Sequence, residues 1–129
     1  MLFDAAHNPA GAAALASYLR DAGIDRLPLV FAGMADKDVE GMLRELIPVV
    51  GPVVVTRASN KRSAEPEALV ELVRRIDPGR SITIAASPME AVDTAWRFSP
   101  RIIVAGSIFL IGDVMKSARQ LVIPFENDR

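Results

Sequence analysis

MLFDAAHNPAG, the stretch from Met1 to Gly11, decides how the rest of this chain is interpreted. An apolar run ends in Asp4, and a short polar turn then leads into an alanine-rich segment with helical spacing. Asn8 can accept a backbone hydrogen bond as a helix N-cap, and Pro9 suits the first helical turn, where its missing N–H loses no bond. The stretch therefore predicts a strand, a turn and a helix. It places Asp4 and the single histidine, His7, at the carboxyl end of a strand, where open α/β sheets bind ligands.

Length and composition favour one domain over residues 1–129. Half of the 129 residues are hydrophobic, enough to bury a single core. The formal net charge is -1, which selects neither nucleic acid nor an anionic membrane as a partner. The chain has no cysteine, so it has no disulfide framework or thiolate metal site, as in a reducing cytosol. The apolar runs are too short to span a bilayer, and an acidic residue, Asp4, stands where a signal peptide carries Lys or Arg. We expect a cytoplasmic protein.

Strand-like apolar runs alternate with helical patterns along the chain. Strands are expected at residues 1–3, 27–32, 52–56, 81–86 and 102–105. Helices are expected at residues 10–22 and 38–47, at the stretch marked by Leu69, Val70, Val73 and Ile76, after the capping box at 87–90, and after 106–107. Gly41 weakens the second helix by about 1 kcal/mol relative to alanine, which indicates a close contact there. The tail from Val122 to Arg129 is expected to fray or pack loosely.

Strands separated by helices predict βαβ units with right-handed crossovers. The expected fold class is a three-layer α/β, Rossmann-like domain with a mostly parallel sheet of five or six strands, in the order 3-2-1-4-5. Such a sheet places every strand-to-helix turn on one edge. The polar turns at residues 4–9, 33–38, 56–63, 86–87 and 106–107 should therefore gather there.

Each polar candidate also has a structural interpretation. Asp4 can accept backbone N–H bonds at a strand end, and His7 can be a polar residue flanking a helix. No second histidine or nearby carboxylate completes a metal shell around this pair, so no metal site is predicted. Asp36 and Asp38 suit a helix start through the macrodipole, but Lys37 between them does not, because a cation is unfavourable there.

Two further candidates lie in later turns. Ser107 can be a helix N-cap. Asn60, Lys61 and Arg62 form by default a solvated loop, although Arg and Lys beside Asn and Ser also suit a carboxylate or phosphate.

Several familiar site motifs are absent. No GxGxxG follows the first strand, and neither a GxxxxGK[ST] phosphate loop nor a G-x-S-x-G nucleophile elbow occurs. The strand at 52–56 ends in Thr56-Arg57, where a phospho-accepting receiver domain would need an aspartate.

The motifs together resemble those of one enzyme family. DAAHNP, at residues 4–9, is similar to the DGAHNP signature of folylpolyglutamate synthase/dihydrofolate synthase, the folate branch of the Mur ligase superfamily. Three later segments agree in order and spacing: GMADKD at 33–38, SNKR at 59–62 and GSIFLIGDV at 106–114. The resemblance covers nearly all of this chain but only the carboxy-terminal domain of the family. Ala5 replaces the signature glycine, which raises the question of a positive φ at that position.

The resemblance implies an ATP-dependent ligase that adds L-glutamate to folate or dihydropteroate through an acyl phosphate. ATP and Mg²⁺ would be bound mainly by a P-loop domain that this chain lacks, so the chain is expected to be an inactive piece of a longer enzyme. His7 is implied as catalytic, Asp4 and His7 as nucleotide-binding, and His7 and Ser107 as glutamate-binding. Residues expected to line the cleft are Lys37, Asp38, Ser59, Asn60 and Arg62. Alternatives are another Mur-type amide ligase, acting on peptidoglycan or cyanophycin, and a stand-alone, non-catalytic binding module.

Overall fold

The structure, a computed structural model, describes the backbone of residues 1–126 and the side chains of residues 1–117. The strands are β1 (Leu2–Asp4), β2 (Leu29–Phe31), β3 (Val53–Val55), β4 (Ile82–Ile84) and β5 (Ile103–Ala105). The α-helices are α1 (Pro9–Asp21), α2 (Val39–Leu46), α3 (Pro66–Ile76), α4 (Pro88–Trp96) and α5 (Ile108–Glu126), and a 3₁₀ turn, η1 (Ile47–Val49), follows α2. The predicted alternation of strands and helices is confirmed.

The five strands form one fully parallel sheet in the order β1-β5-β2-β3-β4. The predicted order 3-2-1-4-5 is wrong, because β5 lies between β1 and β2 and leaves β1 at an edge. Burial explains this arrangement. The three inner strands, LVF, VVV and IVA, are completely buried, whereas LFD and ITI are half-buried or exposed along their length. Strands that carry polar residues thus take the edges, where fewer neighbours cover them.

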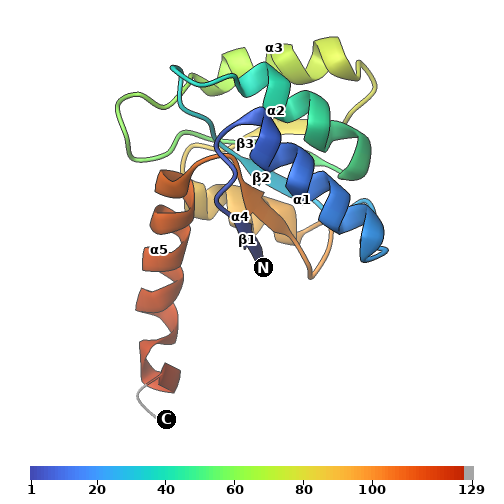
Figure 1. Cartoon of the computed structure of the whole chain (residues 1–129). Helices are drawn as coiled ribbons and strands as arrows, with labels where there is room; N and C mark the ends of the chain where they lie inside the picture. The colour runs from blue at the N-terminus through green and yellow to red at the C-terminus, as the bar shows by residue number, and fades with distance from the viewer. Residues whose placement is uncertain (127–129) are drawn as a thin grey trace.

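Helices cover both faces of the sheet and give the predicted three layers. Figure 1 shows α1, α2 and α3 on one face and α4 and α5 on the other. The first layer buries the predicted apolar stripes of α1 and α2 against alternate strand residues such as Phe31 and Val55. The second layer packs Val92 and Leu110 against the intervening residues, such as Val30 and Val104. Both faces of the inner strands are therefore covered by apolar side chains and shielded from solvent.

The helix starts follow the capping chemistry that the sequence indicates. The Asn8 side chain accepts the Gly11 N–H at 2.7 Å, and Pro9 opens α1. The Ser87 hydroxyl accepts the Glu90 N–H at 3.2 Å. The Glu90 carboxylate reaches the Ala86 N–H at 3.3 Å instead of the Ser87 N–H, so the capping box is displaced by one residue.

A close approach between α1 and α2 occurs at Gly41, as its position in a helix indicates. A Cβ at this position would lie 2.8 Å from Cγ of Pro9, where side chains do not fit. The starts of α1 and α2 are therefore held together. This contact brings the turn after β1 beside the turn after β2.

The carboxy-terminal helix is longer than the sequence indicates. α5 continues to Glu126, so the tail that is predicted to fray or pack loosely from Val122 is helical up to that residue, and residues 127–129 lie outside the described part of the chain. In Figure 1, α5 runs from the sheet edge away from the other helices. None of the described helices combines the length and the apolar character that a membrane span requires.

Candidate functional site

All five strand-to-helix turns lie on the carboxyl edge of the sheet, as a parallel arrangement requires. β5 lies between β1 and β2, and its helix α5 leaves toward the opposite face from α1 and α2. Neighbouring strands whose connections leave to opposite faces open a crevice at their carboxyl ends, and open α/β sheets bind ligands in such crevices. Asp4 pairs in register with Ala105, so the turn holding His7 lies next to the turn holding Ser107. The expected neighbourhood of these two turns is confirmed.

The turn after β1 is held by its own polar side chains. One carboxylate oxygen of Asp4 accepts the Ala6 N–H at 2.9 Å, which fixes the turn and leaves the other oxygen for further partners. His7 is exposed, and its Nδ1 lies 3.2 Å from the Ala5 carbonyl oxygen. Because a carbonyl only accepts, this bond requires Nδ1–H, and a neutral ring then carries its free lone pair on Nε2. The turn thus presents a carboxylate oxygen and an imidazole acceptor.

Ala5, which replaces the signature glycine, needs no special backbone. Among the described residues other than glycine, Arg26 has a positive φ and Ala5 does not. The turn therefore keeps its shape with an alanine at this position.

The turn after β5 is tightly constrained. Gly106 has a φ of 110°, and a Cβ there would overlap the Ala32 carbonyl oxygen and lie 2.7 Å from the Phe31 ring. Ser107 is 2% exposed, and its hydroxyl accepts the N–H groups of Phe109 at 3.0 Å and Leu110 at 3.4 Å. Ser107 is therefore the N-cap of α5, which was the structural interpretation of this residue.

The turn after β2 places an exposed cation, Lys37, on the carboxyl edge of the sheet. Asp38 caps α2 by accepting the Gly41 N–H at 2.9 Å, so its carboxylate is used in capping. Asp36 forms an ion pair with Arg62 at 3.3 Å. Lys37 between them is exposed, and the described residues give its ammonium group no hydrogen bond or ion pair. This lysine is free to meet an anion.

The loop after β3 folds back on its neighbours. The Ala35 N–H donates to the Arg62 carbonyl at 2.7 Å, and the Ala64 N–H donates to the Gly33 carbonyl at 2.7 Å, which joins this loop to the turn after β2. Asn60 stabilises the loop by accepting the Arg62 N–H at 2.8 Å. The predicted cleft-lining segments are thus one connected wall.

Asp113 of α5 ties this wall to the helix that Ser107 caps. Its carboxylate accepts the Ser59 N–H at 2.8 Å and also the Ser59 hydroxyl. We did not select Asp113 from the sequence, although it lies within the GSIFLIGDV segment. A sequence signal was therefore present, but nothing in it indicated a partner in a loop far along the chain.

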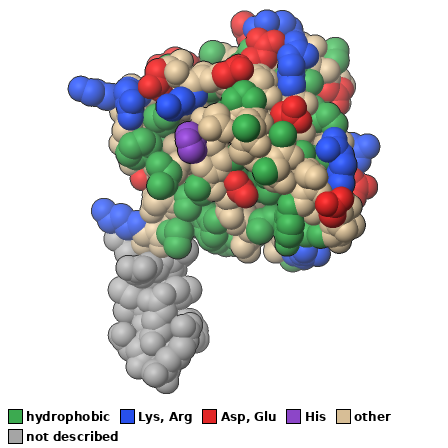
Figure 2. Space-filling view, in the orientation of Figure 1, with side chains coloured by type: hydrophobic (Ala, Val, Ile, Leu, Met, Phe, Trp, Pro, Cys, Tyr) green, Lys and Arg blue, Asp and Glu red, His purple; other side chains and the backbone are tan. Residues whose placement is uncertain are grey.

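The surface around the histidine combines charge and apolar area. Figure 2 shows the single histidine on an open face, with lysine and arginine side chains on one side and hydrophobic side chains toward the start of α5 on the other. Ile108 is 63% exposed and Phe109 is 38% exposed at this start. Among the described residues, no three His, Cys, Asp or Glu side chains converge on a possible metal position.

The comparisons with known proteins agree with this arrangement. Residues 1–108 match the family model described as "Mur ligase, glutamate ligase domain". The chain is 40% identical over 97 residues to the dihydrofolate synthase/folylpolyglutamate synthase of Mycobacterium tuberculosis, covering 74% of this chain and 20% of the relative. It is 30% identical over 127 residues to a probable bifunctional folylpolyglutamate synthase/dihydropteroate synthase of Haloferax volcanii, covering 96% of this chain and 15% of the relative.

Solved structures of folylpolyglutamate synthases also match this chain. The M. tuberculosis folylpolyglutamate synthase complexed with ADP and AMPPCP superposes with a TM-score of 0.76 and 36% identity, covering 92% of this chain and 28% of that one. E. coli FolC in complex with DHPP and ADP gives 0.77 and 26% identity, covering 91% and 28%. The chain thus spans less than a third of each of these relatives. It belongs to the Mur ligase family through the glutamate ligase domain, and its relatives are folylpolyglutamate synthases and dihydrofolate synthases.

Proposed function

We propose that this chain is the carboxy-terminal domain of an ATP-dependent ligase that adds L-glutamate to folate or dihydropteroate through an acyl phosphate. The observation that carries the proposal is the register of β1 with β5, which places the Asp4–His7 turn beside the α5 start. The relatives named above, which carry the same domain, support the folate reaction over peptidoglycan or cyanophycin synthesis.

The residues present suit part of a nucleotide site. The second carboxylate oxygen of Asp4 can accept hydrogen bonds from sugar hydroxyls, and Lys37 can neutralise a phosphate or carboxylate. Among the described residues no three carboxylate or imidazole groups converge, so this domain has no all-protein cage for Mg²⁺, an ion commonly held by one or two carboxylates together with substrate phosphates. We therefore assign ribose and anion contacts to this domain, and metal and phosphate-loop contacts to another domain of the same enzyme.

His7 is the proposed catalytic residue. When the glutamate amine attacks the acyl phosphate carbon, a C–N bond forms, the C–O bond to phosphate breaks, and inorganic phosphate leaves. The amine must also lose a proton, which Nε2 of a neutral His7 can accept because Nδ1–H is held by the Ala5 carbonyl. Ser107 acts through the α5 start that it caps, where a helix N-terminus favours the glutamate carboxylate. Direct contact with its buried hydroxyl would require the cap to open.

The walls of the crevice have a protective role in this proposal. Closure of the β2 and β3 loops, with Asp38, Ser59, Asn60 and Arg62, over a facing domain would exclude water. An acyl phosphate shielded from water survives long enough to meet the amine. Use of ATP and folate fits a cytoplasmic enzyme.

The proposal is tested with a chimera in which residues 1–129 replace the matching domain of the M. tuberculosis relative. ADP release should require both the folate and L-glutamate. A folded chimera without such activity would argue against the proposal. ATP turnover by the purified 129-residue chain alone would contradict the division of labour and favour a different enzyme.

A further inference from the structure

The exposed edge of the sheet at β4 carries a groove that the proposed reaction does not use. The groove has a volume of about 540 Å³ and lies between β4 and α3, far along the sheet from His7. Seven residues line it: Glu67, Val70, Glu71, Arg74, Ile82, Thr83 and Ile84.

The backbone of β4 has unused hydrogen-bonding groups at this edge. Ser81 accepts the Val53 N–H at 2.9 Å, and the Ala85 N–H donates to the Val55 carbonyl at 2.9 Å. In a parallel pair this register directs the N–H and C=O groups of Ile82 and Ile84 away from β3. These two residues thus present a template for another strand.

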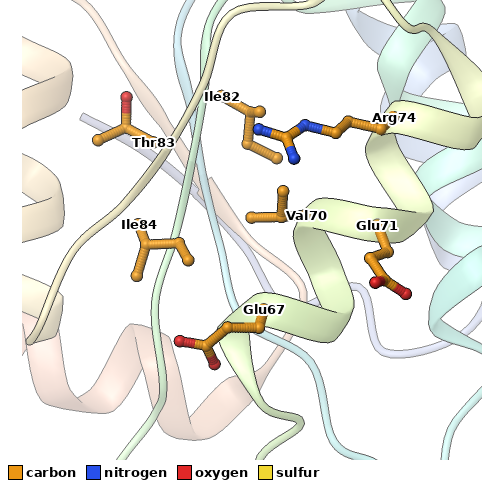
Figure 3. Close-up of a pocket in the computed structure, with 7 residues that line it drawn as sticks. All are labelled: Glu67, Val70, Glu71, Arg74, Ile82, Thr83 and Ile84. Carbon is orange, nitrogen blue, oxygen red and sulfur yellow. The ribbon is translucent and has the colours of Figure 1, made fainter.

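The strand side chains at this edge are apolar, and α3 contributes three charged residues, Glu67, Glu71 and Arg74. Figure 3 shows Ile82, Ile84 and Val70 along the floor, with Thr83 pointing the other way. Arg74 lies on the Ile82 side and Glu67 on the Ile84 side. Neither charge takes part in an ion pair within the described part of the chain. Ile84 is 43% exposed, unusually open for a strand of a parallel sheet.

We propose that the β4 edge is a homodimer interface, in which β4 pairs antiparallel with β4 of a second copy around a two-fold axis at Thr83. In this arrangement Ile82 of one copy lies opposite Ile84 of the other, and their outward backbone groups exchange hydrogen bonds. The four isoleucines share one face, because cross-strand pairs point the same way. The two sheets join into one continuous sheet.

Glu67 and Arg74 favour a second copy as the occupant. An antiparallel neighbour brings the carboxyl end of its strand to the amino end of this one, so its Glu67 meets Arg74 and its Arg74 meets Glu67. A symmetric interface must be self-complementary in this way. The two carboxyl edges then face opposite directions, so neither crevice is covered.

The patch is small. Seven residues a side is well below the roughly 20–30 of a standard interface, so the dimer should be weak and reversible. The two exposed ion pairs contribute mainly to register and orientation. Reversing either charge places two like pairs across the axis, which should raise the dimer dissociation constant about tenfold or more.

Sedimentation velocity over a concentration series of the 129-residue chain tests the interface. The wild-type chain should shift from monomer to dimer as concentration rises. Arg74→Glu and Glu67→Arg should each remain monomeric, their equimolar mixture should form a heterodimer, and the double variant should dimerise again. Arg20→Glu, in the last turn of α1, is the matched control and should dimerise like the wild type. Circular dichroism checks that every variant is folded.

The other outcomes overturn the proposal. A wild-type chain that remains monomeric up to its solubility limit excludes the dimer. A dimer unaffected by the single reversals lies elsewhere on the molecule. Monomeric single variants whose mixture and double variant do not associate exclude the antiparallel register. Ile84→Lys, which places a charge in the middle of the edge, should abolish the dimer without unfolding the chain.

Discussion

Replacing Gly106 with alanine should destabilise the domain strongly, because two separate costs fall on one methyl group. The φ of 110° at Gly106 is a conformation that L side chains rarely adopt, and holding alanine there costs about 1–3 kcal/mol of backbone strain. The added Cβ would also overlap the Ala32 carbonyl oxygen and press on the Phe31 ring, and overpacking of a buried site costs about 1–3 kcal/mol. Together these give a loss of about 2–6 kcal/mol in the free energy of unfolding. A chain of 129 residues has roughly 6–19 kcal/mol in total.

Two other glycines serve as controls, because one has the unfavourable φ without the steric overlap and the other has neither. Gly23 has a φ of 70° with nothing within 4 Å of a built Cβ, so Gly23→Ala should show strain alone, about 1–2 kcal/mol. Gly112 lies inside α5 with open space around it, and Gly112→Ala should stabilise the domain by up to about 1 kcal/mol. Urea denaturation followed by circular dichroism gives each value. A Gly106→Ala variant no less stable than Gly23→Ala would refute the steric part of the reasoning.

Three further predictions follow from the site and its supports. His7→Ala in the chimera should lower turnover by about 10²-fold or more. The urea midpoint should be unchanged, because the ring is exposed and is hydrogen-bonded to Ala5 alone among the described residues. A lower urea midpoint with normal specific activity would make His7 structural. Arg80→Ala should lower the free energy of unfolding in urea by about 2–4 kcal/mol, because its guanidinium, on a side chain only 10% exposed, donates hydrogen bonds to the carbonyls of residues 47, 50 and 51. A change smaller than the error of the method would contradict this. Asp113→Ala should speed amide hydrogen exchange at Ser59 with little effect on the core, and unchanged exchange at Ser59 would show that the tie is not made in solution.

Local structure was predictable because it depends on neighbouring residues. The strand, turn and helix of the first eleven residues are confirmed, down to the Asn8 cap and the Pro9 start. The apolar stripes of α1 and α2 are buried as their spacing indicates, since helical periodicity alone places them on one face. The close contact at Gly41 is also confirmed.

Strand order was not predictable from local patterns. Any strand in a sequence of alternating elements can pair with any other, and the prediction placed β1 in the middle. The residues themselves carried a weaker clue. Asp4 ends β1 and Thr83 lies in β4, and both strands are edges, whereas the wholly apolar IVA of β5 is central.

The candidate site was predictable in part. Its residues gather on one edge because every strand is parallel, which the alternation already implies. Ser107 is predicted either as an N-cap or as a glutamate-binding residue, and seeing that its hydroxyl is buried and used in capping needs the position of α5. The bond between Ser59 and Asp113 was missed because it joins residues whose proximity depends on the packing of α5.

The place of β5 has a consequence for how the molecule is made. Among the described residues β1 pairs with β5 alone, so this pair cannot form until β5, the last strand in chain order, has left the ribosome. The intervening strands can assemble earlier, but closing so long a loop is slow and entropically costly. The turn that holds Asp4 and His7 therefore comes to lie beside the turn that holds Ser107 only after β5 has been synthesised.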